Sequence, residues 1–168
     1  MNLILWRHAD AEEIQPSAGE YGLHLATDLH RQLTERGHKQ AERMANWLAS
    51  RLPETTIVLV SPANRTRQTA TALFKLRKDL EKTHQICPAL QPGTDMTELL
   101  EQCGWPGGKE TVVLVGHNPA LSQLISVLLS GQECPWSVKK GSVWWLANRM
   151  REEASQVVVR AVINPDLI

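Results

Sequence analysis

Residues 3–10, Leu3-Ile4-Leu5-Trp6-Arg7-His8-Ala9-Asp10, join four consecutive apolar residues to a charged turn. An apolar run without alternation is typical of a strand that is covered on both faces, as in a parallel sheet. Ile57 to Val60 and Val112 to Val115 have the same character. Two further strands, Val143 to Leu146 and Val157 to Ile163, are separated by a polar link suited to an antiparallel hairpin. The sequence therefore predicts a mostly parallel sheet with an antiparallel edge.

Helical spacing of apolar residues occupies the intervals between these strands. It predicts one helix from Thr34 to Leu52, a second after Pro62 with Asn64 near its start, and a shorter one over Asp95 to Gln102. A further helix is expected to begin at Asn118-Pro119, and both asparagines are interpreted as helix caps. Because helices alternate with strands, we expect a three-layer α/β/α sandwich in which residues 1–168 form a single domain.

Composition narrows the classes of function. Lys plus Arg number 18 and Asp plus Glu number 18, so the net charge is zero, which argues against nucleic-acid binding. No apolar run approaches the roughly 18 residues of a membrane helix, and the charged N-terminus does not resemble a signal peptide. Three scattered cysteines (Cys87, Cys103 and Cys134) favour a cytoplasmic protein without disulfides. The oligomeric state and the purpose of six tryptophans stay open.

Three of the predicted strands end in polar, mostly basic residues. Arg7 and His8 follow the first strand, Ser61 to Arg65 follow the second, and His117 follows the third. Ligands of open α/β sheets bind beyond the carboxyl ends of the strands. The residues expected to meet there are Arg7, His8, Arg65 and His117. Two arginines and two histidines beside helix N-termini predict a phosphate site, whereas no spacing of ligands indicates a metal, and no cofactor is expected.

Four ordered segments resemble the histidine phosphatase superfamily, whose fold is called phosphoglycerate mutase-like. Leu5 to Ala9 resembles the RHG motif, Ser61 to Ala70 is similar to the SPxxRAxQTA segment, and Val115 to Pro119 matches the second-histidine segment. Asp28 to Gly37 resembles the DxxRxLTxxG pattern of the SixA branch of phosphohistidine phosphatases. The resemblance covers essentially the whole chain and implies a hydrolase. The departures are Ala9 for Gly, Thr66 for Ala and Gln32 for Pro.

The resemblance also implies a role for each residue. His8 would be the nucleophile, forming a phosphohistidine intermediate that water then hydrolyses. Arg7, Arg65 and His117 would bind the phosphoryl oxygens and stabilise charge in the transition state. Arg31, which matches the SixA-branch pattern, is a further candidate for phosphate binding at the rim. The reaction requires a neutral His8, and nearby cations are expected to lower its pKa.

No carboxylate can be assigned as the general acid from sequence. The candidates are Asp10, Asp28, Asp95 and Glu98. A phosphoimidazole leaves as neutral imidazole and scarcely needs an acid, so the missing acid favours cleavage of a P–N bond over a P–O bond. The leading hypothesis is a phosphatase acting on phosphohistidine in a phosphotransfer protein. The alternatives are a phosphomonoesterase or mutase acting on a small phosphorylated metabolite, and a non-catalytic module that binds phosphoproteins.

Overall fold

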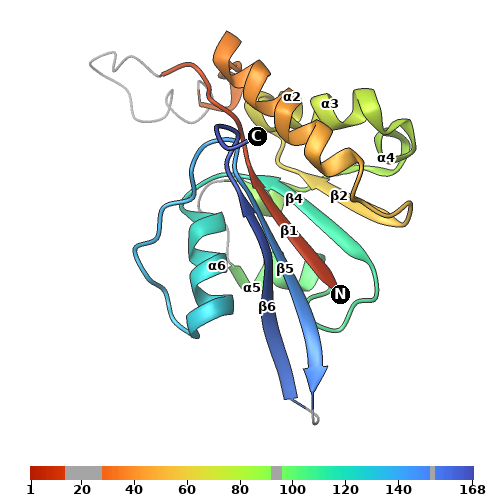
Figure 1. Ribbon diagram of the computed structural model, residues 1–168. Helices are drawn as coiled ribbons and strands as arrows, with labels where there is room; N and C mark the ends of the chain where they lie inside the picture. The colour runs from red at the N-terminus through yellow and green to blue at the C-terminus, as the bar shows by residue number, and fades with distance from the viewer. Residues whose placement is uncertain (14–27, 92–95, 152–153) are drawn as a thin grey trace.

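The strands of the described residues form one sheet in the order β3-β2-β4-β1-β5-β6 (Figure 1). The computed structural model describes residues 1–13, 28–91, 96–151 and 154–168. The strands are β1 (Asn2–Arg7), β2 (Thr56–Val60), β3 (Gln85–Ile86), β4 (Thr111–Gly116), β5 (Val143–Arg151) and β6 (Ala154–Ile163). Parallel pairing joins β3 to β2, β2 to β4 and β4 to β1, whereas β5 is antiparallel to both β1 and β6. The predicted parallel sheet with an antiparallel edge is confirmed.

Helices cover both faces of this sheet (Figure 1). They are α2 (Glu35–Ala49), α3 (Asn64–Leu76), α4 (Lys78–Thr83), α5 (Met96–Gln102) and α6 (Ala120–Ser130). On β1, Ile4 and Trp6 belong to the core shared with α2 and α3, whereas Leu3 and Leu5 belong to the core shared with α5 and α6. All four side chains are fully buried, which explains the unbroken apolar run. The predicted three-layer sandwich is confirmed. Within the described parts of the chain, no helix has the length and apolar character needed to cross a bilayer.

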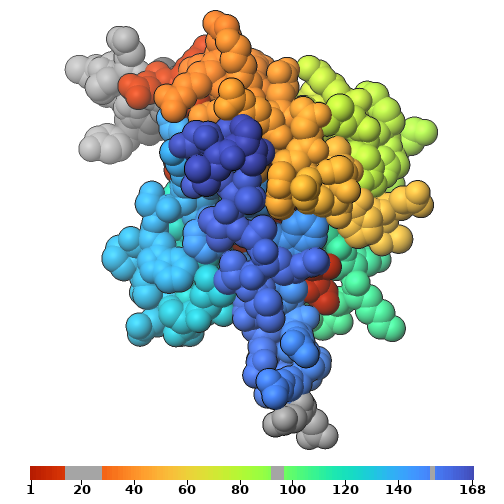
Figure 2. Space-filling model, in the orientation of Figure 1, coloured from red at the N-terminus to blue at the C-terminus, as the bar shows by residue number. Residues whose placement is uncertain are grey.

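Element boundaries differ from the prediction where the chain meets solvent. The apolar pattern misses β3, because its two residues are both exposed, and it misses the six-residue helix α4. The polar link expected between the last two strands is largely strand, because β5 continues to Arg151 and β6 begins at Ala154. This hairpin projects beyond the rest of the sheet (Figures 1 and 2), so its outer residues are solvated and need no apolar alternation.

The expected asparagine caps are wrong. Asn64 makes no cap hydrogen bond, and its amide donates instead to the carbonyl of His30 at 3.2 Å. Pro119 takes the cap position of α6, so Asn118 lies one residue outside the helix, and its amide donates to the carbonyl of Val138 at 3.2 Å. Each asparagine amide therefore holds a neighbouring loop, through His30 or Val138, next to the carboxyl edge of the sheet. The expected start of α5 at Asp95 falls outside the described residues.

Gly37, in the first turn of α2, makes a close approach that fixes the chain after β1. A Cβ at this position would lie 1.9 Å from the carbonyl oxygen and 2.9 Å from the carbonyl carbon of Asp10, and neither backbone atom can give way cheaply. The same Asp10 oxygen accepts the backbone N–H of Thr34 at 3.1 Å. Gly37→Ala is therefore expected to lower the free energy of unfolding by about 2 to 3 kcal/mol, measured by urea denaturation.

A matched control for this substitution is Gly107→Ala. A Cβ at Gly107 would meet no atom within 4 Å, so this variant should stay within about 0.5 kcal/mol of the parent protein. Equal unfolding free energies for the two variants would contradict the close approach of α2 to the end of β1.

Candidate active site

The four residues expected to form the site come together beyond the carboxyl ends of β1, β2 and β4. Arg7 lies opposite Gly116 in the parallel pair of β1 and β4, so the next residues, His8 and His117, leave the sheet side by side. Their ring centroids are 5.2 Å apart. Arg65 stands in the first turn of α3, just after β2, and its charge acts on both rings, as does that of Arg7. Parallel pairing thus brings together residues that are far apart in the sequence.

One ring nitrogen of His8 is hydrogen-bonded to the backbone, and the other has no hydrogen-bond partner among the described residues. Its Nδ1 lies 2.7 Å from the carbonyl oxygen of Ala9, and because a carbonyl only accepts hydrogen bonds, Nδ1 carries the proton of the neutral ring. The backbone is fixed on both sides: the His8 N–H donates to Gly116 at 3.0 Å, and the His8 carbonyl accepts from Gly141 at 2.9 Å. Gly141 has φ of 76°, a conformation that favours glycine. The Nε2 lone pair is therefore left for nucleophilic attack.

Three side-chain nitrogen atoms of the site, one each on Arg7, Arg65 and His117, are buried and have no hydrogen-bond partner among the described residues. His117 places its Nε2 2.8 Å from the hydroxyl of Ser61, which is fully buried. With this hydroxyl as donor, the ring proton lies on Nδ1, and that atom has no partner. The Nε atoms of Arg7 and Arg65 are also buried without a partner. Buried donors are almost always satisfied in folded proteins, so this group can bind the oxygens of an anion.

Burial and nearby positive charge keep both histidines neutral. Burial, followed by the charges of Arg65 and Arg7, lowers the pKa of His8 to about 3, against the opposing effect of its hydrogen bond to Ala9. Burial and then Arg65 lower the pKa of His117 to about 2. Desolvation and the neighbouring Arg65 also lower the pKa of Arg7. At neutral pH the site therefore combines cationic guanidinium groups with uncharged imidazoles.

This arrangement makes the fold sensitive to acid. A histidine in the unfolded chain takes up a proton near pH 6.5, whereas His8 and His117 resist protonation down to pH values of about 3 and about 2. Between these values the unfolded chain holds more protons, so stability is complete above about pH 6.5 and is lost as the pH falls. The expected loss approaches about 1.4 kcal/mol per pH unit for each histidine.

Urea unfolding between about pH 7 and about pH 5 tests this dependence. The parent protein should lose stability toward acid, and His117→Ala should show roughly half the slope because one of the two buried rings is gone. A free energy of unfolding that does not change with pH over this interval would show that the rings are not held neutral by the fold.

Asp28 is bound to cations, which makes it a poor general acid. Its Oδ2 accepts from Arg65 at 2.7 Å and its Oδ1 from Arg31 at 3.0 Å, and its backbone carbonyl also accepts from Arg65. Burial alone would raise the pKa of Asp28, but the hydrogen bonds from Arg65 and then Arg31 outweigh it and lower the pKa. Arg31 reaches the site through this carboxylate, and its charge contributes to the lowered pKa of His8. The structure thus places Arg31 at the rim.

The remaining candidate acids are placed differently. Asp10 pairs with Lys140 at 2.6 Å and accepts the hydroxyl of Thr34 at 2.9 Å, so it joins the turn after β1 to α2 and to the segment before β5. Burial would raise its pKa, but these two hydrogen bonds lower it. Glu98 is exposed on α5, and Asp95 lies outside the described residues. The structure therefore gives Asp10 a structural role and brings neither Asp10 nor Asp28 forward as a proton donor.

Two hydroxyl groups that support the site were not among the site residues predicted from the sequence. Ser61 fixes the ring of His117, as described above. Thr69 accepts the backbone N–H of Ala9 at 3.1 Å and donates to the carbonyl of Arg65 at 2.6 Å, so it ties the turn after β1 to α3. Both residues belong to the segment that resembles the family pattern. The spacing of Thr69, four residues after Arg65 on a helix, is a signal that could have identified it.

A backbone carbonyl also supports the site. The oxygen of Val138 accepts from a terminal nitrogen of Arg7 and from the amide of Asn118. It orients the guanidinium group from the segment that precedes β5. A main-chain oxygen has no residue-specific sequence pattern, so only the structure could reveal this contact.

The fold and the site together define an α/β protein with an arginine- and histidine-lined anion pocket at the carboxyl edge of its sheet. The model of the histidine phosphatase superfamily (branch 1) matches residues 3–91, and the chain belongs to this family. Phosphohistidine phosphatase SixA of Escherichia coli (strain K12) is 29% identical over 137 residues, which cover 80% of this chain and 78% of that protein.

Solved structures confirm the fold. The protein histidine phosphatase SixA complexed with tungstate matches with a TM-score of 0.72 at 24% identity, covering 99% of each chain. A mycobacterial glucosyl-3-phosphoglycerate phosphatase in complex with VO3 matches with a TM-score of 0.62 at 18% identity, covering 95% of this chain and 97% of that one. The predicted phosphoglycerate mutase-like architecture is therefore confirmed.

Proposed function

We propose that the protein removes the phosphoryl group from a phosphorylated histidine of another protein, with His8 as the nucleophile. The observation that carries this proposal is the set of buried nitrogen atoms on Arg7, Arg65 and His117, near the His8 ring, that have no hydrogen-bond partner in the described part of the chain. A phosphoryl group has three non-bridging oxygens that can accept from such donors. Similarity to phosphohistidine phosphatase SixA supports the class of substrate. The free cysteines support a reducing, cytoplasmic location.

The reaction proceeds in two displacements at phosphorus. First, Nε2 of His8 attacks, a bond forms between this nitrogen and phosphorus, and the bond to the substrate nitrogen breaks. The substrate imidazole takes the electron pair of the broken bond and leaves neutral, because its other nitrogen already carries a proton. Water then attacks the phosphoryl group on His8, the new P–N bond breaks, and inorganic phosphate leaves with the protons of the water shared between it and solvent. Arg7, Arg65 and His117 stabilise charge in both transition states.

The placement of the carboxylates supports P–N cleavage. Asp10 and Asp28 are both held by cations, and the pKa of each is lowered, so neither is a ready proton donor at neutral pH. An alkoxide leaving group needs such a donor, since its conjugate acid has a pKa near that of water, roughly 15.7. The conjugate acid of imidazole has a pKa of about 6.5, so imidazole leaves without help. A phosphorylated histidine is therefore the substrate best suited to this site.

The test compares P–N and P–O substrates in one assay. We expect kcat/KM for a protein phosphorylated on histidine to exceed that for phosphoserine, phosphoglycerate and sugar phosphates by at least about 100-fold, which corresponds to about 2.7 kcal/mol in the barrier. Release of inorganic phosphate is measured under the same conditions for each substrate. A monoester that is hydrolysed faster than the phosphohistidine protein would overturn the proposal in favour of a metabolite phosphatase.

A further inference from the structure

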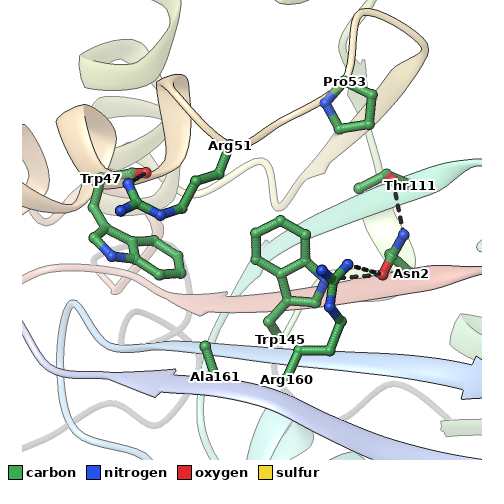
Figure 3. Close-up of a pocket in the computed structure, with 8 residues that line it drawn as sticks. All are labelled: Asn2, Trp47, Arg51, Pro53, Thr111, Trp145, Arg160 and Ala161. Carbon is green, nitrogen blue, oxygen red and sulfur yellow. Dashed lines mark hydrogen bonds between the residues drawn. The ribbon is translucent and has the colours of Figure 1, made fainter.

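A cavity of about 410 Å³, whose lining residues are drawn in Figure 3, opens near the amino-terminal ends of β1 and β4. Asn2 and Thr111 line it, and these are the first residues of β1 and β4, whereas the candidate active site follows the last residues of the same strands. At about 3.3 Å per residue, the length of β1 separates the two places by roughly 17 Å. The volume falls within the range of small-molecule sites, about 300–1,000 Å³.

Two tryptophans and two arginines build the walls of this cavity. Trp47 comes from α2 and Trp145 from β5, and their rings meet edge to face, with centroids 6.1 Å apart and planes at 84°. The guanidinium of Arg51 lies 4.7 Å from the centroid of Trp47, and that of Arg160 lies 4.9 Å from the centroid of Trp145 (Figure 3). Each arginine is thus held over one indole by a cation–π contact. We call this space the Trp–Arg cavity.

A β-bulge brings Arg160 into the cavity. In the antiparallel pair, Trp145 lies opposite Ala161 and Leu146 lies opposite Val159, so Arg160 is the extra residue. Consecutive side chains of a regular strand point to opposite faces, yet Arg160 and Ala161 both line the cavity. Bulges commonly re-aim a side chain beside a functional site. The local irregularity therefore supplies the second positive charge of the cavity.

The charged residues that line the Trp–Arg cavity are positive, and the salt bridges of the described residues include neither Arg51 nor Arg160. The lining residues of this cavity include two arginines and no carboxylate. In the parts of the chain that the structure describes, the hydrogen-bond acceptors of these arginines are neutral: Arg160 donates to the Asn2 amide oxygen at 3.0 Å, and Arg51 to the Trp47 carbonyl at 2.8 Å. A guanidinium has five N–H donors, so each retains donors for a ligand. The Asn2 oxygen also accepts the indole N–H of Trp145 at 3.0 Å, which fixes that ring.

We propose that the Trp–Arg cavity binds a small ligand that combines an aromatic ring with an anionic group, as a mononucleotide does. The half-buried indole of Trp47 offers surface for the ring, whereas Trp145, which is only 6% exposed, forms the floor of the cavity. The exposed guanidiniums of Arg51 and Arg160 bind the anion. A purely apolar ligand would bury two arginines without compensation, and a bare anion would leave the accessible Trp47 indole unused. The site is separate from the phosphoryl site and does not depend on the proposed reaction.

The experiment titrates the uniformly ¹⁵N-labelled protein with AMP and follows the indole N–H resonances by NMR. We expect the resonances of Trp47 and Trp145 to shift and saturate with a Kd of about 1 mM or tighter. The resonance of Trp136, which packs on Trp144 and does not line the cavity, should stay in place. Adenosine carries the aromatic ring without the anion, and ribose 5-phosphate carries the anion without the ring. Each should bind at least about tenfold more weakly than AMP.

Variants distinguish this cavity from the phosphoryl site, because AMP is itself a phosphate monoester. Arg160→Gln should weaken the AMP-induced shifts at least about tenfold, and Arg51→Ala should do the same if the first variant folds poorly. Arg149→Ala, an exposed arginine on the same hairpin, is the matched control and should bind normally. Arg65→Ala should leave the shifts of Trp47 and Trp145 unchanged. Absence of shifts with AMP, their persistence in both cavity variants, or their loss in Arg65→Ala would each overturn the proposal.

Discussion

Replacing His8 with alanine is expected to reduce turnover of a phosphohistidine protein by at least about 10³-fold, because the reaction loses its covalent route. The His8 ring is the only imidazole of the facing pair whose Nδ1 proton is fixed by a backbone carbonyl, which leaves Nε2 for attack. Single-turnover measurement of phosphate release gives the rate of the chemical step. His38→Ala, which removes an exposed ring from α2, is the matched control and should retain full activity.

The same variant separates an enzyme from a module that only binds phosphoproteins. Exposed to a small P–N phosphoryl donor and quenched early, the parent protein should gain one phosphoryl group, seen by intact-mass measurement and mapped to His8. The variant should gain none, yet it should still bind inorganic phosphate, because the donors of Arg7, Arg65 and His117 are all present. Full turnover by His8→Ala, or a phosphoryl group mapped to another residue of the parent protein, would refute the assigned nucleophile.

The central part of the fold was predictable because its physical causes are local. Leu3 to Trp6 is apolar at every position since both faces of β1 are buried, and three such runs are enough to specify a covered parallel sheet. The solvated elements lack that constraint. The two residues of β3 are exposed, and the outer half of the β5–β6 hairpin projects into solvent, so neither carries an apolar pattern that would reveal a strand. Burial, and not strand formation itself, is what the sequence pattern reports.

The features of the candidate active site also divide into those that the sequence predicts and those that it does not. Arg7, His8 and His117 could be expected to meet because each lies at or just after the end of a strand, and parallel strands end at one edge. The contacts that set the positions and pKa values of these residues depend on where loops cross that edge. The ion pair between Asp28 and Arg65 joins residues 37 positions apart through no periodic pattern. The Trp–Arg cavity is still harder to predict from the sequence, because it depends on a bulge that changes the direction of one side chain in β6.

Replacing Arg65 with alanine is expected to lower kcat by about 10²- to 10³-fold, or about 2.7–4 kcal/mol in the barrier, the range for losing one preorganised donor to a developing oxyanion. Arg65 is only 3% exposed, and its Nε has no partner among the described residues, so its N–H can meet a phosphoryl oxygen in a site with little water. Its terminal nitrogens are held by Asp28, which fixes the position of the guanidinium before substrate arrives. Preorganisation of this kind makes the expected effect larger than for an exposed charge.

Arg67→Ala and Arg65→Lys separate this role from a general effect of positive charge. Arg67 stands two residues further along α3 and is exposed, so its removal should change kcat by less than about twofold. Lysine keeps the charge but lacks the planar fork that spans Asp28 and a phosphoryl oxygen at once, so Arg65→Lys should recover only part of the lost rate. The parent protein and all three variants are compared by single-turnover kinetics with one phosphohistidine protein. A change of less than threefold for Arg65→Ala, or equal losses for Arg65→Ala and Arg67→Ala, would mean that the oxyanion is stabilised elsewhere.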